Sequence, residues 1–240
     1  MKLVHTLKRL SNSKDSAALP TQLRRRRFLL FEAMVVALRT QTDEAITVVD
    51  FGGTSAYWDQ VYDMDSNPLR LDVTLVNLAV PQPADPRFRY VEADVRSLDW
   101  MQDRAFDVSF SNSLIEHLGD LSAQAQAVGH MKRVARLLYL QTPNRGFFWE
   151  PHYALPCVHW LSLPVRMRVL SLLNRTSLGD QYDAYIRNPV RLLSRSELRY
   201  LFPETQFDHR RERVLGMTKS YVVRSRVAVA GADNTGIYSD

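Results

Sequence analysis

Asp50-Phe51-Gly52-Gly53 is the segment whose residue types most directly indicate a ligand site. Adjacent glycines let the backbone approach a bound molecule closely, and the acidic residue before them suits a cationic ligand. The next residues, 54–57, are Thr-Ser-Ala-Tyr. The dinucleotide fingerprint Gly-x-Gly-x-x-Gly is therefore absent, which argues against a bound pyrophosphate and against a nicotinamide-dependent oxidoreductase.

Three later segments carry further polar side chains. They are Asp94-Val95, the run from Ser111-Asn112 to Glu116-His117, and residues 142–145 (Thr-Pro-Asn-Arg). Each follows an apolar or alternating run that predicts a β-strand. Ligands of open α/β sheets bind beyond the carboxyl ends of the strands, so we expect all four segments to converge on one edge of a sheet.

The elements that must position these segments are strands alternating with helices. Apolar and β-branched runs predict strands over residues 46–51, 73–78, 88–94, 106–111, 137–142, 206–214 and 219–229. Helical spacing predicts helices over 22–39 and 121–136, and Ser194 and Glu197 form a capping-box sequence for a helix through Phe202. This order predicts an α/β fold: a doubly wound, mostly parallel, seven-stranded sheet covered on both faces.

One domain with flanking segments accounts for the whole chain. We expect an N-terminal arm and helix over residues 1–43, the α/β domain over 44–230 and a flexible tail over 231–240. Residues 145–190 interrupt the strand–helix rhythm with aromatic, Pro, Leu and Arg residues. They predict a helical insertion after the fifth strand that acts as a lid.

Three side chains near these segments are candidates for a general base: His117, Glu150 and His152. Each also has a structural interpretation, because His117 can cap a helix start and Glu150 with His152 can stabilise a loop. Their spacings match no known zinc or iron motif. We therefore predict no metal site.

Taken together, the four segments resemble the class I S-adenosylmethionine (SAM)-dependent methyltransferases. The resemblance is carried by Asp50-x-Gly-Gly-Thr54, Ser111-Asn-Ser-x-Ile-Glu-His117, Thr142-Pro-Asn-Arg145 and Glu150-Pro-His152. It covers residues 44–160, with further similarity over 193–223. It implies a Rossmann-like fold, SAM as cofactor and methyl transfer to a small-molecule acceptor.

The resemblance also assigns cofactor contacts. Asp50, Gly52 and Gly53 would line the methionine and ribose side of SAM. Asp94 and Val95 would face the adenine. The methionyl part would rest on Ser111 and Asn112.

Asn77 is a departure from the family pattern, which usually has Asp or Glu at the end of the second strand to bind both ribose hydroxyls. An amide offers one acceptor oxygen and one donor group, so it can pair with a diol without charge assistance. We expect Asn77 to contact the cofactor. The departure also keeps open an alternative function, a non-catalytic protein that retains the fold for binding or assembly.

Composition limits the partners and the compartment. The net charge is +5 with much of the excess near the N-terminus, yet no RNA-binding module or interleaved aromatic residues accompany it, so we expect no nucleic-acid partner. Cys157 is the only cysteine, which fits a cytoplasmic protein. The apolar run after Arg24 to Arg27 spans only residues 28–38 and contains Glu32, which is too short for a transmembrane segment.

Overall fold

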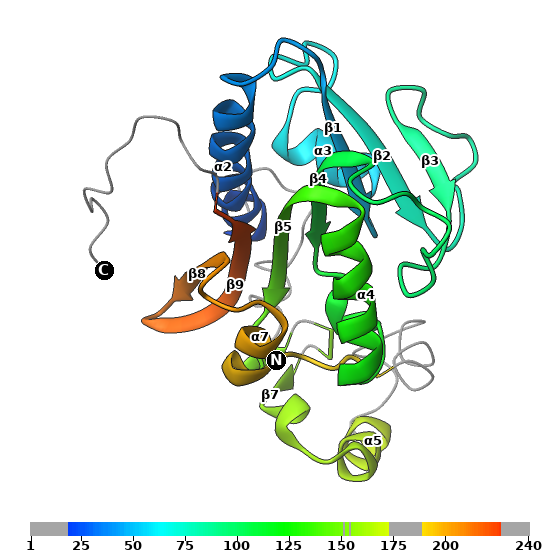
Figure 1. The fold of residues 1–240 in the computed structure, drawn as a ribbon. Coiled ribbons are helices and arrows are strands. Elements are labelled where there is room, and N and C mark those ends of the chain that lie inside the picture. The colour runs from blue at the N-terminus through cyan, green and yellow to red at the C-terminus, as the bar shows by residue number, and fades with distance from the viewer. Residues whose placement is uncertain (1–18, 151, 154, 173–188, 227–240) are drawn as a thin grey trace.

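A seven-stranded sheet forms the centre of the computed structural model, which describes residues 19–150, 152–153, 155–172 and 189–226 (Figure 1). Its strands are β1 (Ile46–Phe51), β2 (Leu71–Asn77), β3 (Arg89–Glu92), β4 (Phe106–Asn112), β5 (Ala135–Pro143), β8 (Phe207–Val214) and β9 (Met217–Ser225). All seven predicted strands are confirmed, with ends that differ by a few residues.

The sheet has the order β3-β2-β1-β4-β5-β9-β8. Strands β1 to β5 pair in parallel, whereas β9 pairs antiparallel with both β5 and β8. The mostly parallel sheet predicted from the sequence is therefore correct. In Figure 1 the carboxyl ends of the parallel strands point downward, which brings the predicted ligand segments to one edge.

Helices bury both faces of the sheet, as the continuous apolar strands predict. On one face, α2 (Leu19–Arg39) and α3 (Ser55–Val61) pack Phe28, Phe31 and Trp58 against β-strand residues such as Phe110. On the other face, α4 (Leu121–Arg133) and α7 (Arg195–Leu201) cover the alternate strand residues. Burial of these aromatic and aliphatic side chains is the main stabilising contribution.

Local capping signals fix where two of the helices begin. Thr54 Oγ1 accepts a hydrogen bond of 3.2 Å from Tyr57 N at the start of α3. Ser194 and Glu197 form the predicted capping box of α7. The first helix of the site therefore starts directly after the glycine turn that ends β1.

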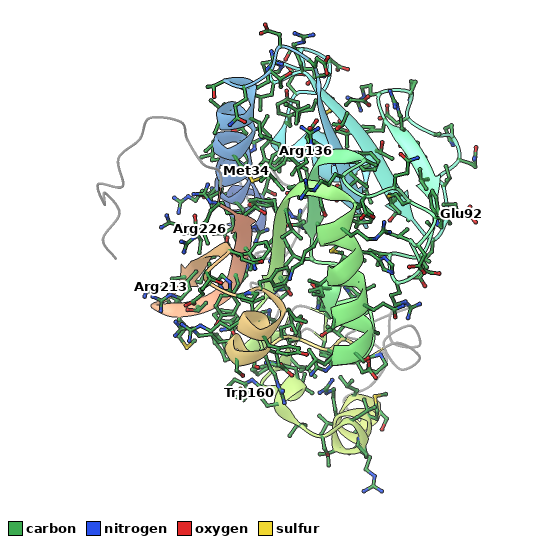
Figure 2. All side chains as sticks on the ribbon, in the orientation of Figure 1. Met34, Glu92, Arg136, Trp160, Arg213 and Arg226 are labelled. Carbon is green, nitrogen blue, oxygen red and sulfur yellow. The ribbon has the colours of Figure 1, made fainter. Side chains whose placement is uncertain are left out.

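The predicted lid is only partly helical in the described residues. After β5 the chain forms a two-stranded ribbon of β6 (Trp149–Glu150) and β7 (Leu155–Pro156), then η2 (Val158–Trp160) and α5 (Leu163–Leu172). Figure 2 places Trp160 beyond the lower ends of the parallel strands. The predicted arm, the tail and residues 173–188 of the insertion lie outside the described residues, so the domain boundaries stay predictions.

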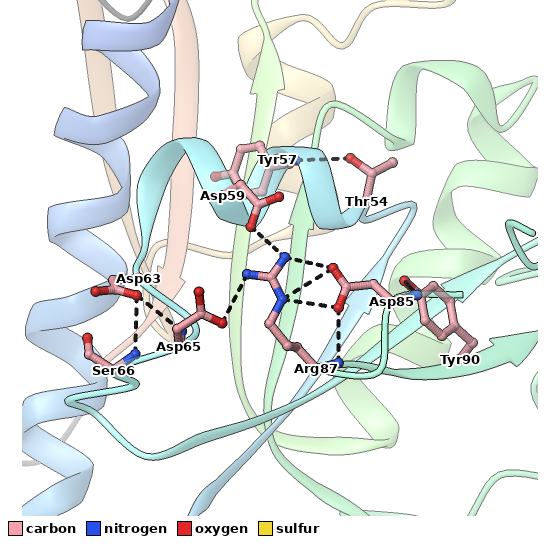
Figure 3. Close-up of polar contacts among 9 residues, drawn as sticks. All are labelled: Thr54, Tyr57, Asp59, Asp63, Asp65, Ser66, Asp85, Arg87 and Tyr90. Atoms are coloured by element: carbon pink, nitrogen blue, oxygen red, sulfur yellow. Dashed lines mark hydrogen bonds and ion pairs between the residues drawn. The ribbon is translucent and has the colours of Figure 1, made fainter. Parts of the chain in front are cut away.

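Arg87 ties the segment before β3 to α3 and the turn after it (Figure 3). Its guanidinium contacts the carboxylates of Asp85 at 2.7 Å, Asp59 at 2.9 Å and Asp65 at 3.5 Å. Hydrogen bonding to Asp85 raises the pKa of Arg87 further above its ordinary value. These partly exposed ion pairs tie α3, which lines the first cavity described below, to the segment before β3.

Candidate functional site

A cavity of about 270 Å³ lies at the end of β1, between α2 and α3. Its walls combine the glycine turn, the start of α3, one side chain of α2 and the end of β4. The lining residues are Arg24, Asp50, Gly52, Gly53, Thr54, Ala56, Tyr57, Gln60 and Asn112. Four of the predicted cofactor residues, Asp50, Gly52, Gly53 and Asn112, are therefore brought together.

Asp50 is the buried acidic group of this cavity, with 1% of its surface exposed. Trp58 Nε1 donates a hydrogen bond of 2.9 Å to its Oδ2. Its Oδ1 is buried and has no hydrogen-bond partner among the described residues. Burial raises the pKa of this carboxyl to about 8, against the smaller opposing effect of the Trp58 bond.

The two glycines are needed by the packing around Asp50. Gly52 has a φ of +77°, a conformation that side chains disfavour, and a Cβ there would lie 2.9 Å from Leu114 Cδ1. A Cβ on Gly53 would lie 1.9 Å from Asp50 Oδ2. Any side chain at position 53 would therefore displace the carboxylate.

Asn77 bonds to the same turn. Its Nδ2 donates a hydrogen bond of 2.7 Å to the carbonyl oxygen of Gly53. An aspartate could not donate this bond, and its oxygen would instead oppose the carbonyl oxygen. The asparagine therefore has a structural reason to stand where the family pattern has an acid, and its Oδ1 still offers an acceptor.

Three other predicted cofactor residues have different surroundings. Asp94 is held by Arg96 through contacts of 3.0 Å to Nε and 2.6 Å to Nη2, which lower the pKa of the carboxyl. Val95 packs in the core beneath α4. Ser111 is buried and donates a hydrogen bond of 3.2 Å to the carbonyl of Phe51. Their proposed contacts with a cofactor stay predictions.

The sequence alone does not predict that several residues line this cavity. Arg24 belongs to a basic N-terminal cluster in the sequence, and in the structure its Nη1 donates a hydrogen bond of 2.8 Å to Gln60 Oε1. Tyr57 and Gln60 face the cavity from α3. The helical spacing of α3 could have shown that residues 57 and 60 share a face, but the approach of Arg24 depends on how α2 packs.

The three candidate bases lie together with a fourth residue, Glu116. His152 Nδ1 lies 2.5 Å from Glu150 Oε1. The rings of His117 and His152 are nearly perpendicular, at 78°, with centroids 4.9 Å apart. Glu116 is fully buried, and Thr142 Oγ1 donates to its Oε2 over 3.4 Å.

Desolvation and neighbouring charges both act on the ionisation of this group. Burial raises the pKa of Glu116 to about 7, and desolvation of the covered part of its ring lowers the pKa of His117, although the residue as a whole is exposed. Burial also lowers the pKa of His152, but its hydrogen bond and charge interaction with Glu150 outweigh this effect, and the net change is an increase. At neutral pH, His117 is therefore a neutral imidazole able to accept a proton.

A larger cavity of about 430 Å³ lies between this group and the insertion. His117 lines it together with the guanidinium-bearing residues Arg96, Arg145, Arg166 and Arg191. Arg166 donates to the carbonyl oxygens of His159 and Leu161, and Arg191 bonds to Glu197 and Gln124. Asp120 also lines the cavity, so among its charged side chains the four arginines outnumber one carboxylate and the wall carries an excess of positive charge.

Comparison with known proteins finds a protein family whose model matches the part of the chain that carries the smaller cavity. A family model described as "Methyltransferase domain" matches residues 50–137. The match confirms the resemblance to the class I SAM-dependent methyltransferases. It spans the end of β1 through the start of β5, which includes the smaller cavity's glycine turn and Asn112. No curated protein matches the chain.

Solved structures are similar to the chain at low sequence identity. A putative Zn-dependent alcohol dehydrogenase from Rhodobacter sphaeroides is 12% identical, with a TM-score of 0.50 over 77% of this chain and 86% of that one. The 1,6-didemethyltoxoflavin-N1-methyltransferase of Burkholderia thailandensis, solved with S-adenosylhomocysteine, is 16% identical, with a TM-score of 0.43 over 79% and 74%. The magnesium protoporphyrin IX methyltransferase of Synechocystis is 9% identical, with a TM-score of 0.45 over 82% and 81%.

Within the described ranges, none of the helices has the length and apolar character that a membrane span requires.

Proposed function

We propose that this chain, whose residues 50–137 match a family model described as a methyltransferase domain, transfers a methyl group from SAM to a small-molecule acceptor. The observation that carries the proposal is Asp50, a buried carboxylate with an unpartnered oxygen at the end of β1. The smaller cavity would take the methionyl and ribose part of SAM, and the larger cavity would take the acceptor.

The donor set of the smaller cavity fits an amino acid group. The methionyl part of SAM carries an ammonium and a carboxylate. Asp50 offers a buried acceptor for the ammonium, and the guanidinium of Arg24 offers donors for the carboxylate. Gly52 and Gly53 let Leu114 and Asp50 keep the places from which a side chain would displace them, while Asn77 Oδ1 would accept from a ribose hydroxyl.

Asp94 and Val95 remain the proposed adenine contacts, and their surroundings limit how each could bind the base. The carboxylate of Asp94 is shared with Arg96, so it would bind an exocyclic amine with the oxygen lone pairs that Arg96 leaves. Val95 is buried, which restricts its proposed contact to the backbone. Ser111 would likewise act by holding the end of β1 in place.

SAM supplies a methyl group already activated on a sulfonium, so the protein mainly has to align the acceptor and exclude water. The neutral His117, which lines the larger cavity, would accept the proton of an acceptor hydroxyl. His152 would pack against its ring, and Glu150 would stabilise the charge that it gains. The acceptor atom then bonds to the methyl carbon, the C–S bond breaks and its electron pair stays on sulfur.

The basic wall of the larger cavity favours an acceptor that carries a negative charge. Arg145 lines this cavity, and its side chain makes no ion pair within the described ranges. A carboxylate or phosphate on the acceptor would supply the missing counter-charge.

Calorimetric titration with SAM and S-adenosylhomocysteine tests the proposal. Asp50→Asn removes the charge and keeps the shape, so we expect it to weaken binding by about 10- to 100-fold, the range for a charge-assisted hydrogen bond. Asp43→Asn is the matched control, because Asp43 is exposed before the amino end of β1. Wild-type protein that binds neither ligand would refute the enzyme proposal and favour the non-catalytic alternative.

A further inference from the structure

Glu116, His117 and His152 place three metal-binding side chains at one point of the sheet edge. One ligand atom from each lies within 4.8 Å of the others. Glu116 and His117 come from η1 (Ile115–His117), whereas His152 comes from the segment between β6 and β7. No metal motif is visible in the sequence, because His152 reaches the other two residues only through the fold.

Among the described residues, Glu116 has a long contact from Thr142 at one oxygen and no hydrogen-bond partner at the other. Its side chain is fully buried, and its Oε1 has no hydrogen-bond partner among the described residues. Glu150 is also buried, and its ion pair is with His152. Across the described ranges no Lys or Arg makes an ion pair with either carboxylate. Buried carboxylates in proteins are ordinarily paired with a cation or bound to a metal.

Glu150 lies where it can orient His152 without being a metal ligand itself. Its Oε1 contacts His152 Nδ1 at 2.5 Å and accepts from His152 N at 3.0 Å. A histidine whose Nδ1–H is bonded to a carboxylate presents Nε2 as the ligand atom, which is the usual arrangement around protein-bound zinc. Thr142 supports Glu116 in a similar way, through its 3.4 Å contact with Oε2.

We propose that Glu116, His117 and His152 bind a divalent transition-metal ion of the zinc type, with Glu150 orienting His152. Two imidazoles and one carboxylate suit such ions better than Mg²⁺ or Ca²⁺. Ligand atoms of a tetrahedral zinc site lie about 3.3 Å apart, so closing the group from 4.8 Å needs an approach of at most about 1.5 Å. Three protein ligands leave a coordination position open, as in catalytic zinc sites.

The open coordination position of the ion would lie beside the larger cavity, because His117 lines that cavity. The role of the ion rests on the proposed methyl transfer, whereas its binding does not. An ion there would hold the acceptor oxygen and lower its pKa. The O–H proton would then pass to water instead of His117, the oxygen would bond to the methyl carbon, and the C–S electron pair would stay on sulfur.

Cobalt(II) titration of untagged protein, followed by visible absorption and by Zn²⁺ competition, tests the site. We expect one Co²⁺ per chain, displaced by Zn²⁺. Glu116→Gln, His117→Ala and His152→Ala should each lower the affinity at least about 10-fold, and Glu150→Gln by about 10- to 100-fold. His159→Asn is the control, because His159 lines the same cavity outside the group.

SAM binding, measured on the same samples, shows that each variant is folded. Asp50→Asn should lose SAM affinity and keep Co²⁺ affinity, which separates the two proposals. Wild-type protein that binds SAM but takes up Co²⁺ no more tightly than His117→Ala would overturn the metal site. Equal losses of Co²⁺ affinity in His159→Asn and the ligand variants would overturn it as well.

Discussion

Asp50 should release a proton when SAM binds. The carboxyl has a pKa of about 8 in the free protein, so about 0.9 of the molecules carry the proton at pH 7. An ammonium against the unpartnered Oδ1 favours the ionised form. If the bound carboxyl is fully ionised, binding at pH 7 releases about 0.9 proton, and binding at pH 9 releases only about 0.1 proton.

The affinity should follow the same titration. SAM binds the ionised form, so the contribution of Asp50 to the apparent association constant should rise about tenfold between pH 7 and pH 9 and level off above the pKa. The α-amino group of the ligand titrates near pH 8 as well. In Asp50→Asn the pH dependence of SAM affinity comes from the ligand and not from this carboxyl. The contribution of Asp50 is therefore the difference in pH dependence between wild type and Asp50→Asn.

Calorimetry in two buffers of different ionisation enthalpy measures the proton release directly. The slope of the observed enthalpy against the buffer enthalpy gives the number of protons exchanged. We expect wild type minus Asp50→Asn to give about 0.9 at pH 7 and to fall towards zero at pH 9. A difference near zero at both pH values would refute the reasoning, because Asp50 would then keep its charge state on binding.

Other variants test the neighbouring contacts. Gly53→Ala places a Cβ 1.9 Å from Asp50 Oδ2 and should cost about 1–3 kcal/mol of unfolding free energy by chemical denaturation, whereas Gly129→Ala, with open space around it, should not destabilise. Asn77→Asp removes the donor to Gly53 O and should destabilise by about 1–3 kcal/mol; unchanged stability would show that this bond is dispensable. Arg87→Gln breaks partly exposed ion pairs and should cost little stability in denaturation curves, by an amount that falls with added salt. The free protein should lose stability as the pH rises from about 4 to 8, since folding raises the pKa of Asp50 above 3.8 and the folded state holds the proton more tightly; this slope should be shallower in Asp50→Asn.

Local signals in the sequence were sufficient for the sheet and the helix starts. Each parallel strand is an apolar or alternating run whose end is marked by a polar or glycine residue, as at Asp50 to Gly53. The Thr54 cap and the Ser194 capping box are contacts within three residues. Because these contacts are short in sequence, a pattern of residue types is enough to predict them.

The contacts that shape the site are of long range, and here the sequence was a weaker guide. Arg24 reaches Gln60 from another helix, and Asn77 reaches Gly53 from another strand. The ribbon of β6 and β7 has only two residues in each strand, too few for an alternating pattern to show. These features depend on the packing of elements, which residue spacing does not encode.

One short segment joins the two proposed cavities and sets their separation. Asn112 lines the smaller cavity and His117 the larger. Between them Ser113 adopts a φ of +58°, held by Ser113 N to Gln141 O at 3.0 Å and Ser113 Oγ to Gln141 Oε1 at 2.8 Å. A non-glycine residue keeps this conformation only where its surroundings enforce it. Methyl transfer needs donor and acceptor held in line, and a segment pinned to β5 at Gln141 supplies that rigidity more directly than a lid would.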